Sequence, residues 1–368
     1  MTTVTASPSL PRRLWRHFCL MLGNQPALSL YLQPLLRAVW PGFMPGQFRG
    51  QLAEKSWQTA DMVKLTLRVS RRWPGFIPGQ HVLLTLEHNG KNLPRPFSIC
   101  SPLSLWHSQR QIELCCKVQH NGAVTPLLAQ LTAGSRVNIS AAQGAFSWQQ
   151  PARPALFVAA GSGITPIASM LLSQRHWLTP VSLYYRVRGK EQAALLAPLQ
   201  QLAAQQPLFS LQLSDSRFEH SDAFTRQVCT EGQNKQLYLC GPQALMQQLN
   251  AALVQSGVAK HNIFQEQFGP ALLAQSTDSI SGQYQVALQS STSQQVFSAQ
   301  ANQSLLQSAE QQGLNPRFGC RIGVCFQCVC DKISGQVRDI RSGALSGHGS
   351  EQIQLCISQP VTDLVLKQ

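Results

Sequence analysis

Acidic residues, and charged residues in general, are scarce in this chain of 368 residues. Only 12% of its residues are charged, and its 16 acidic side chains face 30 basic ones. Because 43% of the residues are hydrophobic, this composition excludes a disordered chain and is typical of an ordered globular protein. At this length, the chain has room for two or three domains with separate cores.

The chain also lacks a long uninterrupted hydrophobic run. Two uncharged stretches, 18–36 and 155–174, approach the length of a membrane-spanning helix. Glycine and proline interrupt both stretches, and no small-residue cleavage site follows the first. We therefore expect neither a membrane span nor a signal peptide.

Cysteine is sparse as well, with 11 residues in the whole chain. An odd and low number argues against a secreted disulfide scaffold. Four of these cysteines belong to the motif described below, and most of the others stand among apolar neighbours, as reduced buried thiols do. The cysteines thus predict a cytoplasmic protein.

The basic excess is unevenly distributed. Residues 1–50 hold five arginines and no acid, residues 51–281 hold 19 basic and 11 acidic side chains, and residues 282–368 hold six and five. A basic middle suits phosphate-bearing cofactors, and a basic head suits an anionic surface. Since the chain contains no Lys/Arg run and no recognised nucleic-acid module, we expect no nucleic-acid partner.

The head, 1–46, is predicted to be an N-terminal helical segment. Apolar residues recur at helical spacing over 14–22 and 28–36, which predicts two short helices. These helices either pack on the body of the protein or contact a membrane or partner. Because arginines flank both stretches, we expect residues 1–45 to make reversible peripheral contact with the inner membrane face.

The next segment, 47–150, is rich in strand patterns. Residues alternate at 62–69, 81–86 and 112–118, between turns that contain glycine and proline. This pattern predicts an antiparallel β-barrel. One of its strands ends in Arg95-Pro-Phe97-Ser98, which by itself is compatible with an exposed Arg beside a packed Phe.

From 151 to 272 the pattern changes to that of an α/β domain with a parallel sheet. Short apolar runs alternate with helical stretches at 191–204 and 242–257, an order typical of crossover connections. The apolar runs are 155–160, 181–185, 209–213 and 236–240.

Two turns at the carboxyl ends of these runs are candidate ligand sites. Gly161-Ser-Gly163-Ile-Thr165-Pro follows the first run and leads into a predicted helix over 167–172. Such glycines let the backbone approach a pyrophosphate, which the amides of the helix start then bind. Cys240-Gly241-Pro242 ends another run at the same edge. Either turn alone is weak support for a nucleotide site.

A polar linker, 273–282, precedes the last domain, 283–368. This domain begins with strands at 284–288 and 295–299 and a helix at 305–312. Its main motif is Cys320-x4-Cys325-x2-Cys328, followed much later by Cys356. Four thiolates at this spacing predict a plant-type [2Fe–2S] cluster. Structural zinc is the alternative, but it prefers two short C-x2–4-C pairs.

Taken together and in this order, the motifs resemble the ferredoxin–NADP reductase superfamily of flavoproteins, joined to a plant-type ferredoxin. The resemblance implies a flavin-binding barrel, an NAD(P)-binding domain and an α+β (β-grasp) ferredoxin domain. It implies that Arg95 binds the flavin phosphate, that Phe97 lies on the isoalloxazine and that Ser98 lies near its N5 atom. Phe97 replaces the usual Tyr, and Phe326 replaces a Gly that is common in ferredoxins.

The same resemblance assigns further residues. Gly122 and Thr125 correspond to a second flavin-phosphate contact. The turns containing Gly161, Gly163 and Thr165, and Cys240, Gly241 and Pro242, correspond to the nicotinamide-dinucleotide site. Catalytic roles are implied for Ser98, Cys240 and Glu266, the last of which belongs to an acidic-aromatic pair that closes the reductase module.

The implied activity is that of an NAD(P)H:acceptor oxidoreductase. A hydride passes from the nicotinamide to the flavin, and single electrons then pass to the cluster and to an acceptor. FAD is expected rather than FMN. NADPH is expected rather than NADH because Ser216-Arg217 resembles a 2′-phosphate site, although Asp215 argues against it.

The cluster motif also suggests an electron acceptor. The Cys325-Phe-x-Cys328 variant is similar to bacterial reductases that serve membrane fatty-acid desaturases, so a membrane-bound desaturase is the expected partner. The reductase component of a ring-hydroxylating oxygenase or another monooxygenase is the alternative within the enzyme class. An iron–sulfur redox sensor or a zinc-stapled binding protein is the alternative from another class.

Overall fold

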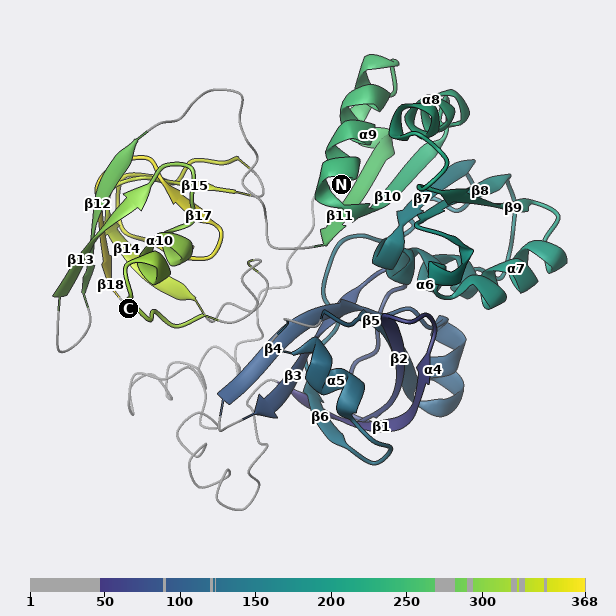
Figure 1. Ribbon diagram of the computed structural model, residues 1–368, viewed down its shortest axis with the longest axis horizontal. Coiled ribbons are helices and arrows are strands. Elements are labelled where there is room, and N and C mark those ends of the chain that lie inside the picture. Colours follow the sequence, from purple (N-terminus) through teal and green to yellow (C-terminus); the bar gives the residue numbers. More distant parts are fainter. Residues whose placement is uncertain are drawn as a thin grey trace, which may run out of the picture.

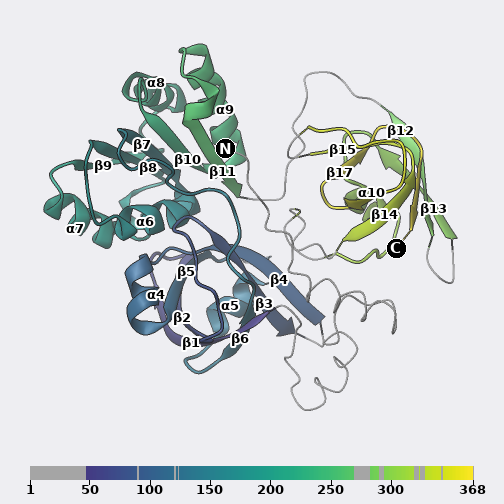
Figure 2. The same cartoon turned by 180° about the vertical axis from the view of Figure 1, so that it is seen from behind.

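The computed structural model describes residues 47–88, 91–119, 122, 124–268, 282–289, 294–318, 323, 328–340 and 343–367 (Figure 1). The predicted N-terminal helical segment and nearly all of the predicted linker lie outside the described residues, as do Cys320 and Cys325. The predicted fold class is confirmed, because three large sheets follow one another along the chain: one antiparallel, one parallel and one mixed (Figures 1 and 2). No helix in the described ranges is long and apolar enough to cross a membrane.

The first sheet is a barrel of six antiparallel strands in the order β4-β3-β6-β1-β2-β5. Ile99, just beyond β4, pairs with Leu114 of β5 and so closes the sheet on itself. Alternate residues such as Val63, Leu65 and Leu67 fill the interior. The strands are β1 (Phe48–Trp57), β2 (Met62–Val69), β3 (His81–His88), β4 (Lys91–Ser98), β5 (Gln111–Lys117) and β6 (Arg136–Ile139), with helices α4 (Leu103–Gln109) and α5 (Thr125–Gln130).

The second sheet is parallel and has the order β9-β8-β7-β10-β11. This is the 3-2-1-4-5 arrangement of dinucleotide-binding folds, in which the strand order reverses beside the first strand. Its strands are β7 (Ala155–Ala160), β8 (Val181–Val187), β9 (Phe209–Asp215), β10 (Gln236–Pro242) and β11 (Ile263–Phe268), and its helices are α6 (Ile164–Ser173), α7 (Leu196–Gln205), α8 (Ser221–Glu231) and α9 (Gln243–Gln255).

Alternation along the buried strands determines which helices cover each face of this sheet. Phe157 and Ala159 of β7 pack with α6 and α7, whereas Leu156 and Val158 pack with α8 and α9. Both faces are therefore apolar. This explains why the strands appear in the sequence as continuous hydrophobic runs rather than alternating ones.

The predicted helix over 191–204 is wrong over its first five residues. Lys190–Gln192 forms a 3₁₀ turn, and the helix α7 starts only at Leu196. Leu195 has a φ of 58°, in the left-handed region. Ala194 is fully buried, and its carbonyl oxygen accepts a hydrogen bond of 3.2 Å from Tyr185 Oη. This tertiary contact overrides the helical propensity of the apolar sequence.

The C-terminal sheet has the order β13-β12-β18-β14-β16, and a two-stranded sheet, β15-β17, accompanies it. The β12–β18 pair is parallel and the other three pairs of this five-stranded sheet are antiparallel, which agrees with the predicted α+β domain. Its elements are β12 (Gln283–Gln289), β13 (Gln294–Gln300), α10 (Leu305–Gln311), β14 (Val329–Ser334), β15 (Val337–Asp339), β16 (Glu351–Gln354), β17 (Ser358–Pro360) and β18 (Leu364–Lys367).

Candidate functional site between the barrel and the parallel sheet

The end of β4 carries the three predicted flavin residues. Phe97 lies opposite Val82 of β3 and packs against the barrel core. Ser98 lies opposite His81 and is only 5% exposed. Its Oγ atom has no hydrogen-bond partner among the described residues. Arg95 is half-buried, and its Nη1 donates to the carbonyl oxygen of Pro94 at 2.8 Å.

His81 and Glu266 connect the barrel to the last strand of the parallel sheet. His81 Nδ1 lies 3.5 Å from Glu266 Oε1, and both side chains are largely buried. The other polar atoms of this pair, His81 Nε2 and Glu266 Oε2, have no partner in the described part of the chain. Together with Ser98 Oγ, they place three buried polar atoms without partners at this junction.

Cys240 reaches the same junction from β10. It lies opposite Ala159 of β7 and Glu266 of β11 and is fully buried. Burial raises the pKa of the Cys240 thiol well above its ordinary value, and the Glu266 carboxylate adds to the shift. The thiol therefore remains protonated and is a neutral, compact wall of the site.

Two glycines allow the turns after β7 and β10 to touch. A Cβ at Gly163 would lie 2.1 Å from the carbonyl oxygen of Cys240, and a Cβ at Gly241 would lie 2.8 Å from Ala160 Cβ. Gly161 differs, because its φ is 53° and no heavy atom lies within 4 Å of its Cβ position. One side of the Gly161 turn is thus open to a ligand while the other is closely packed.

Buried hydroxyls hold the backbone of this turn. Thr165 Oγ1 donates to the carbonyl oxygen of Ser162 at 3.0 Å, and Tyr185 Oη lies 3.4 Å from that of Gly161. The predicted helix over 167–172 in fact begins earlier, at Ile164, directly after a 3₁₀ turn over Gly161–Gly163.

The second predicted flavin-phosphate contact is a tight turn that leads into α5. The Gln119 amide donates to Thr125 Oγ1 at 2.9 Å. A Cβ at Gly122 would lie 2.9 Å from the same hydroxyl. Glycine is therefore required for this turn to close over the Thr125 side chain.

Arg217 lies beyond β9 and is engaged by two carboxylates. Its Nη2 is 2.6 Å from Asp215 Oδ2, and its Nη1 is 3.0 Å from Glu191 Oε1. The hydrogen bonds that Arg217 donates to the Asp215 carboxylate lower the pKa of Asp215 and raise the pKa of Arg217. The guanidinium predicted to bind a 2′-phosphate is thus held by acidic neighbours.

The two cluster ligands that the structure describes lie side by side in the core of the C-terminal domain. Cys328 Sγ is 3.2 Å from Cys356 Sγ, much longer than the roughly 2.05 Å of a disulfide bond. Both side chains are buried in the same apolar cluster. Cys330 is buried in that cluster too, on the adjoining strand β14.

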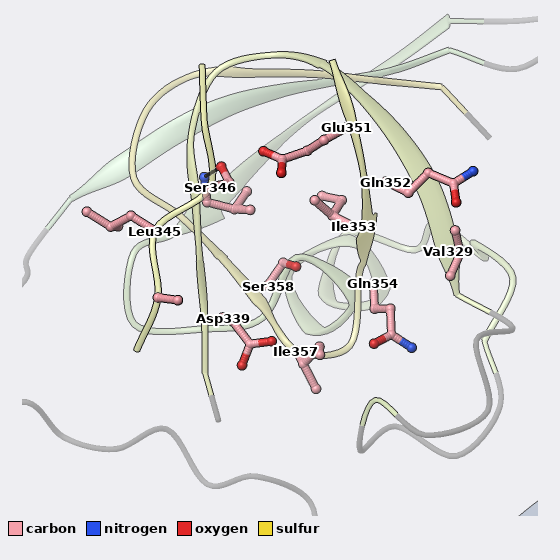
Figure 3. A pocket seen from close by; sticks show the side chains of 12 residues that line it. Val329, Asp339, Leu345, Ser346, Glu351, Gln352, Ile353, Gln354, Ile357 and Ser358 are labelled. Carbon is pink, nitrogen blue, oxygen red and sulfur yellow. Dashed lines mark hydrogen bonds between the residues drawn. The ribbon is translucent and has the colours of Figure 1, made fainter. Parts of the chain in front are cut away.

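A shallow groove of about 340 Å³ opens beside these cysteines, between β16 and the β15–β17 pair (Figure 3). Val329 follows Cys328 in the chain, and Ile357 follows Cys356; both line the groove. Leu345 and the carboxylates of Asp339 and Glu351 complete its apolar and acidic surface. The groove is thus a surface next to Cys328 and Cys356, the two predicted cluster ligands that the structure describes.

These features fit the predicted cofactors. Three buried polar atoms without partners at the end of β4 are suited to the polar edge of a flavin ring. The open Gly161 turn at the reversal of strand order is suited to a dinucleotide pyrophosphate. Adjacent buried sulfurs are suited to iron. The roles of the individual residues remain predictions.

Sequence reasoning missed His81 and Tyr185. His81 directly follows the Gly79-Gln80 turn at the start of a strand, but nothing in the sequence indicates that β3 and β11 meet. Tyr185 ends an apolar run and reads as a core residue. In both cases the sequence does not show which distant residue the side chain contacts: Glu266 for His81, and Ala194 for Tyr185.

Comparison with known proteins yields three domain matches in the predicted order. Residues 49–148 match the oxidoreductase FAD-binding domain, residues 157–250 the oxidoreductase NAD-binding domain, and residues 288–361 the 2Fe-2S iron-sulfur cluster binding domain. FAD, NAD(P)H and a [2Fe–2S] cluster are therefore the cofactors, and the zinc and redox-sensor alternatives lose their support.

Relatives that match two thirds or more of the chain agree. An NADPH oxidoreductase of Mycobacterium tuberculosis is 31% identical over 293 residues, which cover 78% of this chain and 75% of that protein. A vanillate O-demethylase oxidoreductase of Pseudomonas putida is 29% identical over 248 residues, 67% of this chain and 76% of that one.

A solved structure shows the same fold. This is phthalate dioxygenase reductase, described as a modular structure for electron transfer from pyridine nucleotides to [2Fe-2S]. It superposes with a TM-score of 0.60 and 22% sequence identity. The superposition covers 88% of this chain and 98% of that one. The chain thus belongs to the ferredoxin-reductase type of oxidoreductases, the iron–sulfur flavoproteins that join FAD-binding, NAD-binding and [2Fe–2S] domains in one polypeptide.

Proposed function

We propose that this protein carries electrons from NADPH, through FAD and the [2Fe–2S] cluster, to the oxygenase component of a multicomponent oxygenase in the cytoplasm. The proposal rests on the order of the three modules in this chain and on the names of several similar proteins, which belong to oxygenase or demethylase systems. The bound cofactors supply the redox chemistry by accepting a hydride and releasing electrons singly.

In this proposal the barrel residues hold the flavin. Arg95, Gly122 and Thr125 bind its phosphates, because a guanidinium and exposed turn amides are strong phosphate donors. Phe97 supports the ring by stacking. The Ser98 hydroxyl, which is buried and lacks a protein partner, donates to the reacting edge of the ring.

The parallel sheet orients the nicotinamide. The Gly161, Gly163 and Thr165 turn binds the pyrophosphate. Cys240, Gly241 and Pro242 form the wall against which the nicotinamide lies. Glu266, adjacent to Cys240 across the β10–β11 pair, closes the site and excludes water from the reacting atoms.

We assign Arg217 to the coenzyme's 2′-phosphate. Arg217 is half-exposed, so a phosphate can approach it without moving the sheet. Asp215 and Glu191 orient its guanidinium but also compete for it. The proposal therefore includes only a moderate preference for NADPH over NADH, set by the balance between one guanidinium and two carboxylates.

Cys320, Cys325, Cys328 and Cys356 hold the cluster, from which electrons leave. The groove lined by Leu345, Ile353 and Glu351 offers the acceptor a surface close to two of these ligands. Proximity is essential here, because the acceptor must approach the cluster for electrons to pass.

A membrane-bound fatty-acid desaturase, the acceptor expected from the sequence, is the second candidate. It rests on the Cys325-Phe-x-Cys328 variant. The names of the relatives favour an oxygenase component over it, as in the 3-chlorobenzoate dioxygenase reductase of Comamonas testosteroni, 27% identical over 230 residues.

Reconstitution distinguishes the two acceptors. The purified holoprotein and NADPH are mixed either with the oxygenase component of vanillate O-demethylase or with membranes containing a fatty-acyl desaturase, and NADPH-dependent product is measured. The proposal predicts product with the oxygenase and little with the desaturase. The reverse result would assign the chain to desaturation, while NADPH-dependent reduction of ferricyanide would confirm that the reductase is intact.

A further inference from the structure

Lys332 is a charged side chain in the core of the C-terminal domain. It lies on β14, two residues after the buried Cys330, at a position where the alternation of the strand points into the core. Its side chain is fully buried. In the sheet it lies between Leu366 of β18 and Glu351 of β16. Lysine is almost never fully buried without partners, so the contacts of this ammonium explain why it is there.

Four oxygen atoms surround the Lys332 ammonium. Its Nζ atom donates to the carbonyl oxygens of Gly335 and Gly347, each at 2.9 Å, and to that of Gly349 at 2.6 Å. It also lies 3.2 Å from Glu351 Oε1. An ammonium has three N–H donors, so the three carbonyls satisfy its hydrogen bonds while the carboxylate balances its charge.

Stability alone does not account for a lysine at this position. An apolar side chain would fill the space without removing a charge from water, and such replacements of buried ion pairs are often neutral or stabilising. An apolar side chain could not, however, join carbonyl groups from separate parts of the chain. Lys332 does so, because Gly335 lies in the turn after β14 whereas Gly347 and Gly349 lie in the segment that precedes β16.

This second part of the chain is the glycine-rich segment, residues 343–350. It contains no helix or strand, and it has three glycines, at positions 343, 347 and 349. Glycine loses more conformational freedom on ordering than any other residue, so the segment needs contacts that hold it. Ser346 is held by β15, since its amide donates to the Val337 carbonyl oxygen at 2.8 Å and its Oγ accepts from the Val337 amide at 2.9 Å. Lys332 holds the second half.

The glycine-rich segment forms one side of the groove beside the cluster ligands. Figure 3 shows Leu345 and Ser346 of this segment on one side, and Val329 and Gln352 on the other. Leu345 is 53% exposed, so the segment presents an apolar side chain to whatever enters the groove. After the segment, the chain passes directly into β16, which lines the groove with Glu351–Gln354.

Lys332 therefore connects the two sides of this groove. It binds the glycine-rich segment through two carbonyls and the first residue of β16, Glu351, through the carboxylate. Lys332 does not itself line the groove. Its ammonium acts through the residues that it holds, by fixing how far the segment lies from β16.

We propose that Lys332 is a positioning residue for the electron acceptor, because it holds the groove in the shape that the acceptor binds. This inference rests on the proposed function, in which the acceptor approaches the cluster through this groove. Without the ammonium, only a fraction of the molecules should present the formed groove, and the apparent affinity for the acceptor should fall by that fraction. Reduction of the cluster should not change, because Lys332 contacts neither the flavin residues nor the four predicted cluster cysteines.

The test compares three variants of the holoprotein. Lys332→Met removes the ammonium but keeps an unbranched side chain. Lys367→Met, the matched control, removes the same charge from an exposed position on the neighbouring strand β18. Ser346→Ala loosens the glycine-rich segment at its other end and leaves the buried lysine in place.

Three kinds of measurement are made on each variant. Cluster absorbance, iron content and NADPH–ferricyanide activity show whether the cofactors and the reductase are intact. Hydrogen exchange reports the order of residues 344–351. Steady-state kinetics give KM and kcat for two protein acceptors, the oxygenase component of vanillate O-demethylase and cytochrome c.

The proposal predicts that Lys332→Met exchanges faster over residues 344–351 and has a higher KM for both protein acceptors. The rise in KM should be about tenfold if the groove is formed in about a tenth of the molecules. Cluster absorbance, iron content and kcat should stay at their wild-type values. Ser346→Ala should raise KM in the same direction, and Lys367→Met should leave both KM and exchange unchanged.

Four results would overturn the proposal. These are an unchanged KM in Lys332→Met, an unchanged KM in Ser346→Ala, an equal rise in Lys367→Met, and loss of the cluster in Lys332→Met. The third would assign the effect to net charge, and the fourth would assign the lysine to folding of the domain. A wild type that reduces cytochrome c but not the oxygenase component contradicts only the proposed function, and the KM for cytochrome c then decides the role of Lys332.

Discussion

The Nδ1 atom of His81 lies 3.5 Å from the Oε1 atom of Glu266, which joins the first residue of β3 to the last strand of the parallel sheet. Gly144 makes this approach possible, since a Cβ there would lie 3.1 Å from His81 Nδ1. The two domains of the reductase module thus meet through a polar pair whose remaining atoms face the proposed flavin site.

This pair should be energetically coupled. In a double-mutant cycle of His81→Leu and Glu266→Leu, each single change leaves one buried polar group without its partner and should cost about 1–3 kcal/mol. The double variant should recover part of that cost, giving a coupling of about 0.5–3 kcal/mol. Urea unfolding measures all four proteins. The same cycle at the exposed Lys117–Asp61 pair should give less than about 1 kcal/mol.

Ser98→Ala should slow flavin reduction while leaving the stability of the protein nearly unchanged. The Ser98 hydroxyl has no protein partner in the described residues, so its removal should change the free energy of unfolding by less than about 1 kcal/mol. If it donates to the reacting flavin, stopped-flow flavin reduction by NADPH should slow about a hundredfold. An unchanged rate, or a large drop in stability, would remove Ser98 from the catalytic residues.

The protein should lose stability in alkali. Burial raises the pKa of Cys115 to about 12 from an ordinary value of 9.0, and it also raises the pKa values of the Cys100, Cys116 and Cys240 thiols. Because the folded values exceed the unfolded ones, the unfolded chain ionises first as the pH rises. The stability contribution is therefore complete below pH 9 and lost between pH 9 and 12.

For each such thiol, the free energy of unfolding should fall by up to about 1.4 kcal/mol per pH unit in this window. Urea unfolding at a series of pH values gives the slope. Cys115→Ala should reduce the slope relative to the wild type. A flat profile up to pH 12, or an unchanged slope in that variant, would contradict this explanation.

Coenzyme preference should respond to Arg217 and Asp215 in opposite directions. Arg217→Ala should lower the ratio of kcat/KM for NADPH to that for NADH by about tenfold or more, because the charge-assisted bonds to a 2′-phosphate are lost. Asp215→Asn should raise the same ratio, because it removes the carboxylate that lies 2.6 Å from the guanidinium. Steady-state kinetics with both coenzymes decides this, and an unchanged ratio in both variants would rule out the assignment.

Sequence patterns predicted the fold well where local and global signals agree. The sequence of β7 is a continuous apolar run because both faces of that strand are buried. The sequence of β2 alternates because one face of that strand lines the barrel interior. The helix over 191–204 was wrong because a buried hydrogen bond from Tyr185 to Ala194, invisible in the local sequence, holds the chain out of helical geometry.

The site was predictable only in part for the same reason. Ser98, Cys240 and Gly163 stand out in the sequence as motifs at strand ends. The sequence does not show that His81 meets Glu266, since these residues are 185 positions apart and lie in different sheets. Nor does it show that Glu191 and Asp215 both hold Arg217. This contact needs a glycine at position 189, because a Cβ there would lie 2.5 Å from Arg217 Nη2.

The route of electrons through the [2Fe–2S] cluster is tested most directly by Cys356→Ala in the full-length protein, with Cys330→Ala as the matched control. We expect Cys356→Ala to lose the cluster absorbance and NADPH-dependent cytochrome c reduction but to keep NADPH–ferricyanide activity, because hydride transfer to the flavin needs no iron. Cys330→Ala should keep all three. Full iron content and undiminished cytochrome c reduction in Cys356→Ala would contradict the proposed route of electrons through this cluster.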